Sequence, residues 1–339
     1  MSKIIVNDYD REVYEKELKN FLPESFIDIH THLNKKEFEH YGDHNGGSSW
    51  TDLIAEELPI EDLMDFLKQL FPQNNVTPLI FGDVMQVHKQ VNDYVYECGK
   101  KYNLPTLFRT DYKMDPDFLE EEVKKGGFLG LKPYLSNCPS YIPSSETRIY
   151  DFLPKEHLEV ANKNGWIVML HIPRDLRIKD AVNLAQLMEI EEKYPNVKLI
   201  VAHIGRAYSK QDLGNAFDIL KNTKNMMFDF TANLCSDAIE ACIDAVGVDR
   251  LMFGSDLPIA IMRMYRIVDE NGVYHNVVPR GLYGDVSNEP HMKETDEKDV
   301  TLMIYEQILA LKEVAVRKSL SDSDVEKIMY LNSKKLLSI

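Results

Sequence analysis

The stretch FIDIHTHL, residues 26–33, decides the fold and supplies the first candidate site residues. Side chains alternate along a β-strand, so we expect Asp28, His30 and His32 on one face and the isoleucines with Thr31 on the other. In a closed barrel one face of each strand points inward, and the apolar set suits the side that faces surrounding helices. Two imidazoles and a carboxylate would then lie inside the barrel.

Such buried polar groups need partners, because each unsatisfied group costs about 1–3 kcal/mol. A divalent metal ion would provide one, since neutral imidazole is a common metal ligand. His30 and His32, two positions apart on one strand, can converge on a single ion. Taken alone, the H-x-H motif fits a pair of hydrogen-bonded histidines at a strand end equally well.

Short apolar runs recur along the chain, and segments with helical spacing of apolar residues separate them. The predicted strands are Phe26–Thr31, Val76–Phe81, Leu104–Thr110, Phe128–Pro133, Trp166–His171, Val197–His203, Met226–Phe230 and Arg250–Ser255. Nearly continuous apolar runs such as WIVML favour a parallel sheet covered on both faces. Eight strands alternating with helices predict an α/β fold, the (β/α)₈ TIM barrel. A doubly wound sheet is the alternative, but no G-x-G-x-x-G motif follows any strand.

Three segments extend the predicted barrel. Residues 1–24 form an N-terminal helical extension. Long loops follow the first strand, over residues 34 to about 60, and the eighth strand, over residues 257–295, and both exceed ordinary loop length. Both follow the carboxyl end of a strand, where barrels carry their active sites, so we expect lids or pocket walls. Residues 1–339 are therefore expected to form a single barrel domain.

Composition narrows the class of protein. The 339 residues carry 39 Lys+Arg and 55 Asp+Glu, and 39 − 55 gives the net charge of −16. That balance disfavours a nucleic-acid surface, which needs clustered cations. No apolar run reaches the ~20 residues that cross a membrane, and the acidic start lacks a signal core. The four cysteines contain no C-x-x-C pair, which favours reduced thiols in a cytoplasmic protein.

Three more polar residues end predicted strands: His171, His203 and Asp256. Each alone is more often a helix cap or a satisfied core histidine than a ligand. Together with His30 and His32, they come from strands one, five, six and eight and reach the same face of the barrel. Histidine and carboxylate ligands suit Zn²⁺ or a similar ion, whereas Mg²⁺ and Ca²⁺ prefer oxygen ligands.

The motifs DIHTH, AHIG around His203 and FGSDLP around Asp256, with His171 ending strand five, resemble the amidohydrolase superfamily. More narrowly, they resemble its amidohydrolase-related branch of metal-dependent hydrolases and decarboxylases. The resemblance runs from Phe26 to the C-terminal helix, with the motifs in the family's order. It implies a metal-bearing barrel in which His203 is a catalytic acid/base or an additional ligand. By motif position, the resemblance assigns one metal ion to His30, His32, His171 and Asp256.

Lys132, in FLGLKPY, stands on the predicted fourth strand. Two-metal members of the superfamily carry a carboxylated lysine or a glutamate there, but this stretch resembles the GxK sequence of the one-metal branch. We therefore expect one divalent ion, Zn²⁺ first, with Mn²⁺ or another divalent ion as the alternative. Lys132 is expected as a cation in the pocket, and a structural ion pair with a neighbouring carboxylate is an equal alternative.

These residues predict a chemistry. A bound divalent ion lowers the pKa of its water to about 7, and Asp256 or His203 would take the remaining proton as catalytic residues. We therefore expect a hydrolase that acts on a lactone, an amide or a similar acyl group. The same metal and a carboxylate-binding pocket also fit a non-oxidative decarboxylase. A metal-binding scaffold without turnover ranks lower, because every expected ligand type is present.

Arginines are frequent near the same face, and guanidinium groups bind carboxylates through paired hydrogen bonds. They are Arg109, Arg174, Arg206, Arg263, Arg266 and Arg280. Arg174 and Arg206 follow His171 and His203 by three residues, so they are the expected contacts to substrate, with Lys132 beneath them. Surface salt bridges are the alternative for at least half of the arginines.

The remaining expectations concern the pocket and its partners. Tyr134, Trp50 and Tyr283 are candidates to line the pocket or to pack in the core. The expected partner is a small anionic molecule, with neither nucleic acid nor membrane. A homodimer would be ordinary for an enzyme of this type, although no sequence feature demonstrates one.

Overall fold

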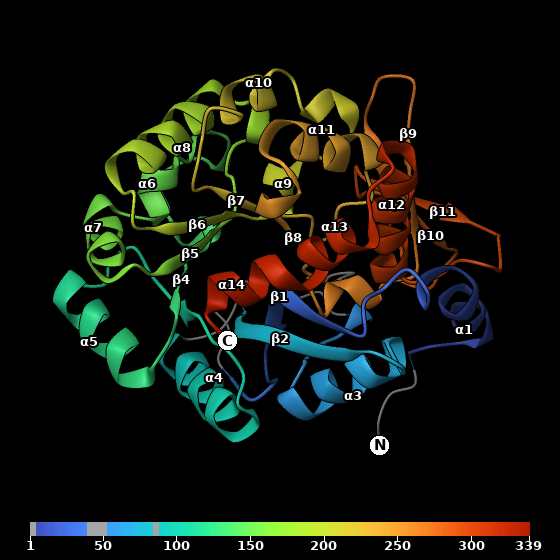
Figure 1. Ribbon diagram of the computed structural model, residues 1–339, viewed down its shortest axis with the longest axis horizontal. Helices are drawn as coiled ribbons and strands as arrows, with labels where there is room; N and C mark the ends of the chain where they lie inside the picture. Colours follow the sequence, from blue (N-terminus) through green and yellow to red (C-terminus); the bar gives the residue numbers. More distant parts are fainter. Residues whose placement is uncertain (1–4, 39–52, 84–87) are drawn as a thin grey trace.

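The computed structural model describes residues 5–38, 53–83 and 88–339, and within them eight parallel strands surround a central axis (Figure 1). The strands are β1 (Ser25–Leu33), β2 (Asn75–Gly82), β3 (Phe108–Arg109), β4 (Gly130–Lys132), β5 (Ile167–Leu170), β6 (Lys198–Val201), β7 (Met227–Asp229) and β8 (Leu251–Met252). Each lies within or overlaps one of the eight predicted runs. The predicted (β/α)₈ TIM barrel is therefore confirmed.

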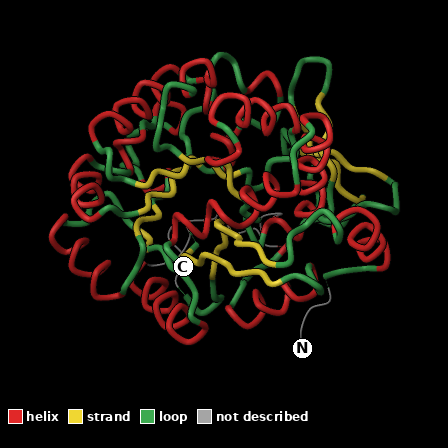
Figure 2. The backbone as a smooth tube through the Cα atoms, in the orientation of Figure 1, coloured by secondary structure: helices red, strands yellow, loops and turns green. Residues whose placement is uncertain are grey.

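Backbone hydrogen bonds close the ring of strands. β3 to β8 pair in chain order, and β1 pairs with β2. A bridge between Ile80 and Thr106 joins β2 to the approach of β3. At the other seam, Ile29 donates its N–H to the carbonyl of Phe253 at 3.0 Å. Figure 2 shows the strands in the centre with the helices outside them.

Helices connect the strands and cover the outside of the barrel. They are α3 (Ile60–Leu70), α4 (His88–Tyr102), α5 (Pro116–Gly126), α7 (Lys155–Asn164), α8 (Ala181–Lys193), α10 (Ala216–Leu220), α11 (Ser236–Val246) and α12 (Met303–Lys318). Local sequence sets their ends. In α5, for example, the Asp115 carboxylate caps the first turn ahead of Pro116, and Gly127 ends the helix at φ 64°.

The interior of the barrel has its own small apolar cluster, separate from the layer between strands and helices. Ile27, Leu79, Met169 and Ile200 contribute to it from four strands. Leu337, in the C-terminal helix α14 (Asn332–Leu337), packs into the same cluster, and Figure 1 shows α14 lying across the strands. Apolar side chains thus fill part of the barrel interior around Leu337, whereas the histidines lie at the carboxyl ends of the strands.

The predicted alternation along FIDIHTHL is wrong for Asp28 and for Ile27 and Ile29, which were expected to face the helices. The register of β1 against β2 shifts after Asp28, which is a β-bulge. Ile27 and Ile29 belong to the interior cluster. The bulge changes which residues point inward after this point, so that His30 and His32 also face the interior. The Asp28 carboxylate instead accepts the backbone N–H of Ser255 at 2.8 Å and of His30 at 3.2 Å. Strict alternation assumes an unbroken pleat, and one extra residue breaks it.

The segment after β8 is a small sheet rather than an irregular loop. It holds β9 (Tyr265–Val268), β10 (Tyr274–Pro279) and β11 (Met292–Thr295), in the order β11-β10-β9. Gly272, at φ 79°, lies in the tight turn between β9 and β10. The expected wall after the eighth strand therefore has its own backbone pairing.

The connection after β1 is described only at its two ends. Asn34 and Leu58 exchange backbone hydrogen bonds of 3.2 and 3.1 Å, which bring the ends together. Residues 39–52, including Trp50, lie outside the described residues. The described residues contain no helix long and apolar enough to cross a membrane.

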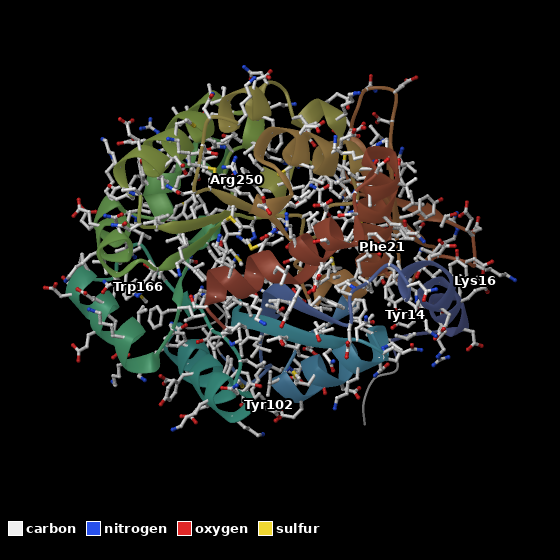
Figure 3. The ribbon with its side chains drawn as sticks, viewed as in Figure 1. Tyr14, Lys16, Phe21, Tyr102, Trp166 and Arg250 are labelled. Carbon is white, nitrogen blue, oxygen red and sulfur yellow. The ribbon has the colours of Figure 1, made fainter. Side chains whose placement is uncertain are left out.

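An ion pair ties the N-terminal extension to the barrel. The described part of the extension contains α1 (Asp8–Val13) and then a π-helical turn that includes Tyr14 (Figure 3). The Tyr14 hydroxyl donates to the Asn74 side chain at 2.7 Å. Asp10 is fully buried and binds Arg263 through both carboxylate oxygens, at 2.9 and 2.6 Å. The Thr301 hydroxyl donates to the same carboxylate at 2.8 Å.

We predict that Asp10→Ala destabilises the protein. Removing one member of a buried pair leaves the Arg263 charge without its partner, so the free energy of unfolding should fall by about 3 kcal/mol. Asp8→Ala is the matched control, because Asp8 is an exposed residue in the same helix, and its loss should leave stability unchanged. Equal urea midpoints for the two variants would show that the pair does not anchor the extension.

Candidate metal centre

Four histidines and an aspartate meet at the carboxyl end of the barrel. His30 and His32 come from β1, while His171, His203 and Asp256 follow β5, β6 and β8. Their ligand atoms form two groups, each spanning no more than 4.8 Å. The groups are His30, His171 and His203 in one, and His30, His32 and Asp256 in the other. The structure thus brings together all five residues that the sequence selected.

The distances within this cluster are short. The Oδ1 atom of Asp256 lies 3.0 Å from Nε2 of His32 and 3.5 Å from Nε2 of His30. On the other side, Nε2 of His171 lies 2.9 Å from Nε2 of His203. His30, which belongs to both groups, is fully buried.

Three of the four histidines have their Nδ1 atom occupied by an outer partner. Nδ1 of His30 lies 3.1 Å from the carboxylate of Asp229, and Nδ1 of His203 lies 2.9 Å from the Thr231 carbonyl. A carboxylate and a carbonyl can only accept hydrogen bonds. Nδ1 of each histidine therefore carries the proton, and Nε2 keeps its lone pair. Partners of this kind orient histidine ligands in metal sites.

His32 follows the same pattern through Tyr134. The Tyr134 hydroxyl donates its single proton to the Gly82 carbonyl at 2.6 Å, so it accepts from Nδ1 of His32 at 3.0 Å. The sequence left Tyr134 as either a pocket-lining or a core residue, and the structure places its hydroxyl against His32. Tyr283 instead accepts the backbone N–H of Arg263 at 2.7 Å and is not in the cluster.

This arrangement tests whether a metal ion fits. Lone pairs on Nε2 of His30 and His32 face the carboxylate oxygen of Asp256, and no proton is left on those nitrogens to bridge the gap. A cation shared by these three electron-rich atoms would replace their mutual repulsion with attraction. A set of imidazole nitrogens and one carboxylate oxygen suits Zn²⁺ or another borderline divalent ion. The residues of this cluster therefore fit a divalent metal ion.

Burial sets the charge state of the ligands. It lowers the pKa of His30 and His171 well below the ordinary value, and the adjacent Lys132 lowers both further. Burial alone would raise the pKa of Asp256, but the surrounding imidazoles outweigh burial and hold this pKa below the ordinary range. Neutral imidazoles and an ionised carboxylate are the forms that bind metal.

Lys132 lies against the same cluster. Its Nζ atom is 3.1 Å from Nδ1 of His171 and 3.4 Å from Nε2 of His30, and the side chain is fully buried. Burial lowers the pKa of Lys132 to about 7, against the pull of Asp229 and Asp256. Over residues 5–38, 53–83 and 88–339 no carboxylate lies within ion-pair distance of Lys132, and its hydrogen-bond contacts are the two imidazoles.

Asp229, at the end of β7, is a site residue that sequence reasoning missed. Its Oδ1 accepts the backbone N–H of His203 at 2.7 Å and of Thr231 at 3.2 Å, while Oδ2 holds His30. The bond to His203 secures a left-handed residue, at φ 58°, which is otherwise a strained conformation. The sequence could have indicated Asp229, because the stretch MFDF places its carboxylate at the end of the predicted seventh strand.

The predicted substrate arginines have protein partners. Nε of Arg174 lies 3.0 Å from the carboxylate of Asp180, and its Nη1 lies 3.4 Å from Glu146. Arg206 donates to the Ile172 carbonyl at 3.1 Å. Arg280 forms surface ion pairs with Glu294 and Asp296. The structure therefore gives several of these cations the structural role that the sequence left open.

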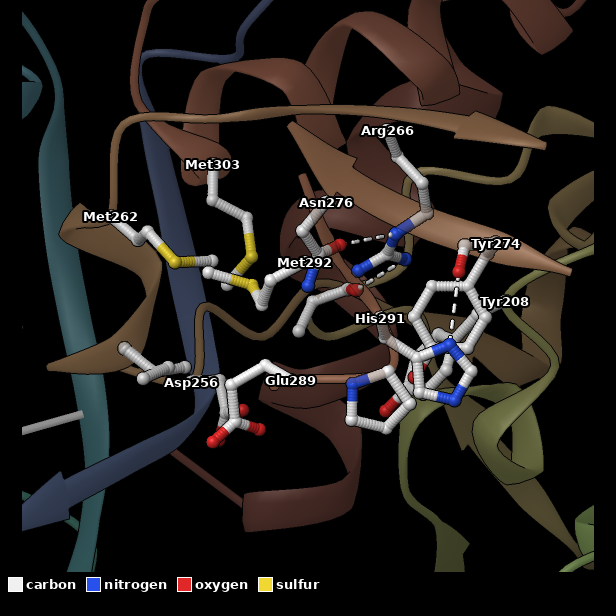
Figure 4. Close-up of a pocket in the computed structure, with 13 residues that line it drawn as sticks. Tyr208, Asp256, Met262, Arg266, Tyr274, Asn276, Glu289, His291, Met292 and Met303 are labelled. Atoms are coloured by element: carbon white, nitrogen blue, oxygen red, sulfur yellow. Dashed lines mark hydrogen bonds between the residues drawn. The ribbon is translucent and has the colours of Figure 1, made fainter. Parts of the chain in front are cut away.

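A cavity of about 270 Å³ lies beside Asp256 (Figure 4). The β9–β11 sheet supplies one wall, including Arg266 and Asn276, and Tyr208 supplies another. Three methionine side chains line the side next to Asp256, Met303 among them. A space of this size suits a small molecule.

Comparisons with known proteins agree with this architecture. Residues 27–339 match the model of a protein family described as Amidohydrolase. No curated protein matches the chain.

Several solved structures are similar. One, from Acinetobacter baumannii, is described as a probable 2-pyrone-4,6-dicarboxylic acid hydrolase with citric acid bound (15% identity, TM-score 0.59, covering 93% of this chain and 99% of that chain). An amidohydrolase from Burkholderia multivorans has 13% identity and a TM-score of 0.60, with the same coverages. A dihydroxybenzoic acid decarboxylase from Polaromonas sp. JS666, with bound manganese, has 15% identity and a TM-score of 0.54, covering 93% and 97%. At these identities the likeness shows the fold.

We predict that Asp229→Asn weakens metal binding 10- to 100-fold. The amide oxygen can still accept the N–H of His203, but the amide nitrogen would face Nδ1 of His30 and favour the tautomer whose Nε2 carries the proton. Competition titration with a chelator, with metal content by elemental analysis, measures the change. Asp218→Asn, at an exposed position, is the matched control, and equal affinities in both variants would refute the orienting role of Asp229.

Proposed function

Because the chain belongs to the amidohydrolase family, whose model it matches over residues 27–339, we propose that it is a metal-dependent hydrolase. Its substrate would be a small carboxylated lactone or amide. The observation that carries this proposal is the convergence of His30, His32 and Asp256 lone pairs, with His171 and His203 beside them, at the carboxyl end of the barrel.

We assign one divalent ion to His30, His32, His171 and Asp256. When bound, it would polarise the substrate carbonyl and acidify water, which is the chemistry expected of such an ion. Zn²⁺ is our first choice, because imidazole nitrogens dominate the donor set. Mn²⁺ is the alternative, since the Polaromonas decarboxylase of similar fold holds manganese.

The protein's own side chains would handle the protons. Asp256 is ionised and points into the cavity, so it can accept a proton from the attacking water. His203 holds its Nδ1 proton on the Thr231 carbonyl, which leaves Nε2 to receive or deliver a proton at the reacting group. Lys132 would stabilise negative charge that develops nearby. Arg174 and Arg206 stay predictions as substrate contacts, because their present partners are protein groups.

Non-oxidative decarboxylation is the second candidate. It is favoured by the likeness to a dihydroxybenzoic acid decarboxylase, which covers 93% of this chain, and by the same cluster of histidines with a buried cation. The two reactions differ in their products, because hydrolysis adds one water and decarboxylation releases CO₂. A scaffold without turnover remains the lowest-ranked alternative.

We also propose a cytoplasmic protein whose partner is a small anion. Four free cysteines fit a reducing compartment, and the charge of −16 disfavours nucleic acid as a partner. A homodimer remains a prediction.

Product analysis tests the proposed reaction. The full chain, loaded with Zn²⁺ or Mn²⁺ and checked by elemental analysis, would be screened against carboxylated lactones and amides with parallel detection of CO₂. We expect metal-dependent addition of water and loss of bound metal in His171→Ala. Release of CO₂ would support the decarboxylase instead, and full metal content in His171→Ala would remove His171 from the ligand set.

His203→Ala tests the proton-transfer role. We expect kcat to fall about 10²- to 10⁴-fold, because a positioned acid/base contributes that much, with metal content retained. His157→Ala is the matched control, since His157 is also buried but contacts the Met114 carbonyl at 2.9 Å, away from the cluster. Loss of metal from His203→Ala would make this residue a ligand, and unchanged turnover would remove it from the mechanism.

A further inference from the structure

Arg266, on β9, presents a hydrogen-bond donor that the protein does not use. Its Nε donates to the side-chain oxygen of Asn276 at 3.0 Å and its Nη1 donates to the Ala232 carbonyl at 3.2 Å. In the part of the chain that the structure describes, Nη2 has no hydrogen-bond partner, and no carboxylate lies within ion-pair distance. A guanidinium that lines a cavity without a counter-ion is costly.

Asn276 presents a second unused donor beside the first. It stands directly opposite Arg266 in the pairing of β10 with β9. Its side-chain oxygen is committed to Nε of Arg266, which fixes the orientation of the amide. Its Nδ2 has no partner among the described residues, and both side chains line the cavity next to Asp256.

Aromatic rings hold the guanidinium in place. It lies 4.8 Å from the ring centre of Tyr208 and 5.0 Å from that of Tyr274. Tyr274 in turn stacks on His291 with a centroid distance of 4.1 Å. Arg177 contacts the same two tyrosine rings, but it has a carboxylate partner, Asp212, at 3.7 Å.

The two ends of the cavity differ in charge. Figure 4 shows the carboxylates of Asp256 and Glu289 on one side and Arg266 with Asn276 on the other. A molecule that spans the space would therefore meet donors at one end and the candidate metal centre at the other. Methionine side chains near Asp256 and tyrosine rings near Arg266 also line the cavity, and they suit an apolar or aromatic body.

We propose that Nη2 of Arg266 and Nδ2 of Asn276 form the subsite that binds the carboxylate of the substrate. The identity of the ligand as a substrate rests on the proposed function, whereas the subsite itself does not. Two fixed donors side by side match the two oxygens of a planar carboxylate. The subsite belongs to the sheet after β8, and it selects carboxylated substrates independently of Arg174 and Arg206.

Binding of a simple acid tests the subsite without turnover. The probes are acetate, butyrate and benzoate, titrated by calorimetry into the metal-loaded full chain, with benzamide as the neutral counterpart of benzoate. Asn276→Asp keeps an oxygen for Arg266 but replaces the free donor with negative charge. We expect at least one acid to bind, and to bind at least tenfold more weakly to Asn276→Asp, while metal content is unchanged.

Controls separate the subsite from the metal centre. Asn271→Asp makes the same change at an exposed position in the turn between β9 and β10, and it should bind the acids as the unaltered protein does. Arg266→Met should reproduce the loss seen with Asn276→Asp. For benzoate, if it is the acid that binds, the unaltered protein should prefer it to benzamide.

Two results would overturn the proposal. Equal acid binding by Asn276→Asp, Arg266→Met and the unaltered protein would place the carboxylate elsewhere, at the metal or at Arg174 and Arg206. Failure of all three acids to bind at about 10 mM, well above a weak dissociation constant of ~1 mM, would also refute it. Neither result depends on whether the protein is a hydrolase. Metal content and product analysis test that question separately.

Discussion

The seam between β1 and β8 is the constraint on which the site depends. Asp256 donates its backbone N–H to the His30 carbonyl at 2.9 Å, and the buried Asp28 carboxylate joins Ser255 to His30. These bonds close the barrel and at the same time set the carboxylate of Asp256 against the two histidines of β1. The same contacts between β1 and β8 therefore close the barrel and assemble the candidate metal centre. They join residues that are far apart in the sequence.

Much of this was predictable, because periodic apolar runs and polar residues at strand ends report burial directly. All eight strands, and the meeting of His30, His32, His171, His203 and Asp256, follow from that pattern. The β-bulge after Asp28 could not be predicted, since alternation carries no mark of an inserted residue. The contact between Asp229 and His30 could have been suspected from the position of Asp229, but its geometry depends on the closed ring. The β9–β11 sheet was missed because its strands are short and half-exposed.

The net charge of −16 does not show that several cations lie near the candidate site. Many acidic residues of the described chain form exposed ion pairs, such as Glu12 with Lys16 and Asp93 with Lys89, which contribute little to stability. The cations near the site divide by what they contact: Arg174 and Arg263 bind carboxylates of the fold, whereas Lys132 contacts imidazoles and Arg266 contacts an amide, a carbonyl and aromatic rings. Burial disfavours the charged form of both Lys132 and Arg266 and lowers both pKa values. An anion near either one would offset that cost.

The attachment of the β9–β11 sheet explains why it can act as a rigid wall. At its start, Arg263 is held by Asp10 of the N-terminal extension, and Met264 donates its N–H to the Thr301 carbonyl at 3.1 Å. Met303, at the start of α12, donates to the Met262 carbonyl at 2.7 Å, which closes the segment on itself. A side chain on β9 or β10 is thus positioned by backbone pairing rather than by a free loop. The barrel strands do not pair with this sheet, and a side-chain link to the histidine cluster runs from Arg266 through the ring of Tyr208 to His203. The barrel would then determine the chemistry, and the added sheet would determine which molecules reach it.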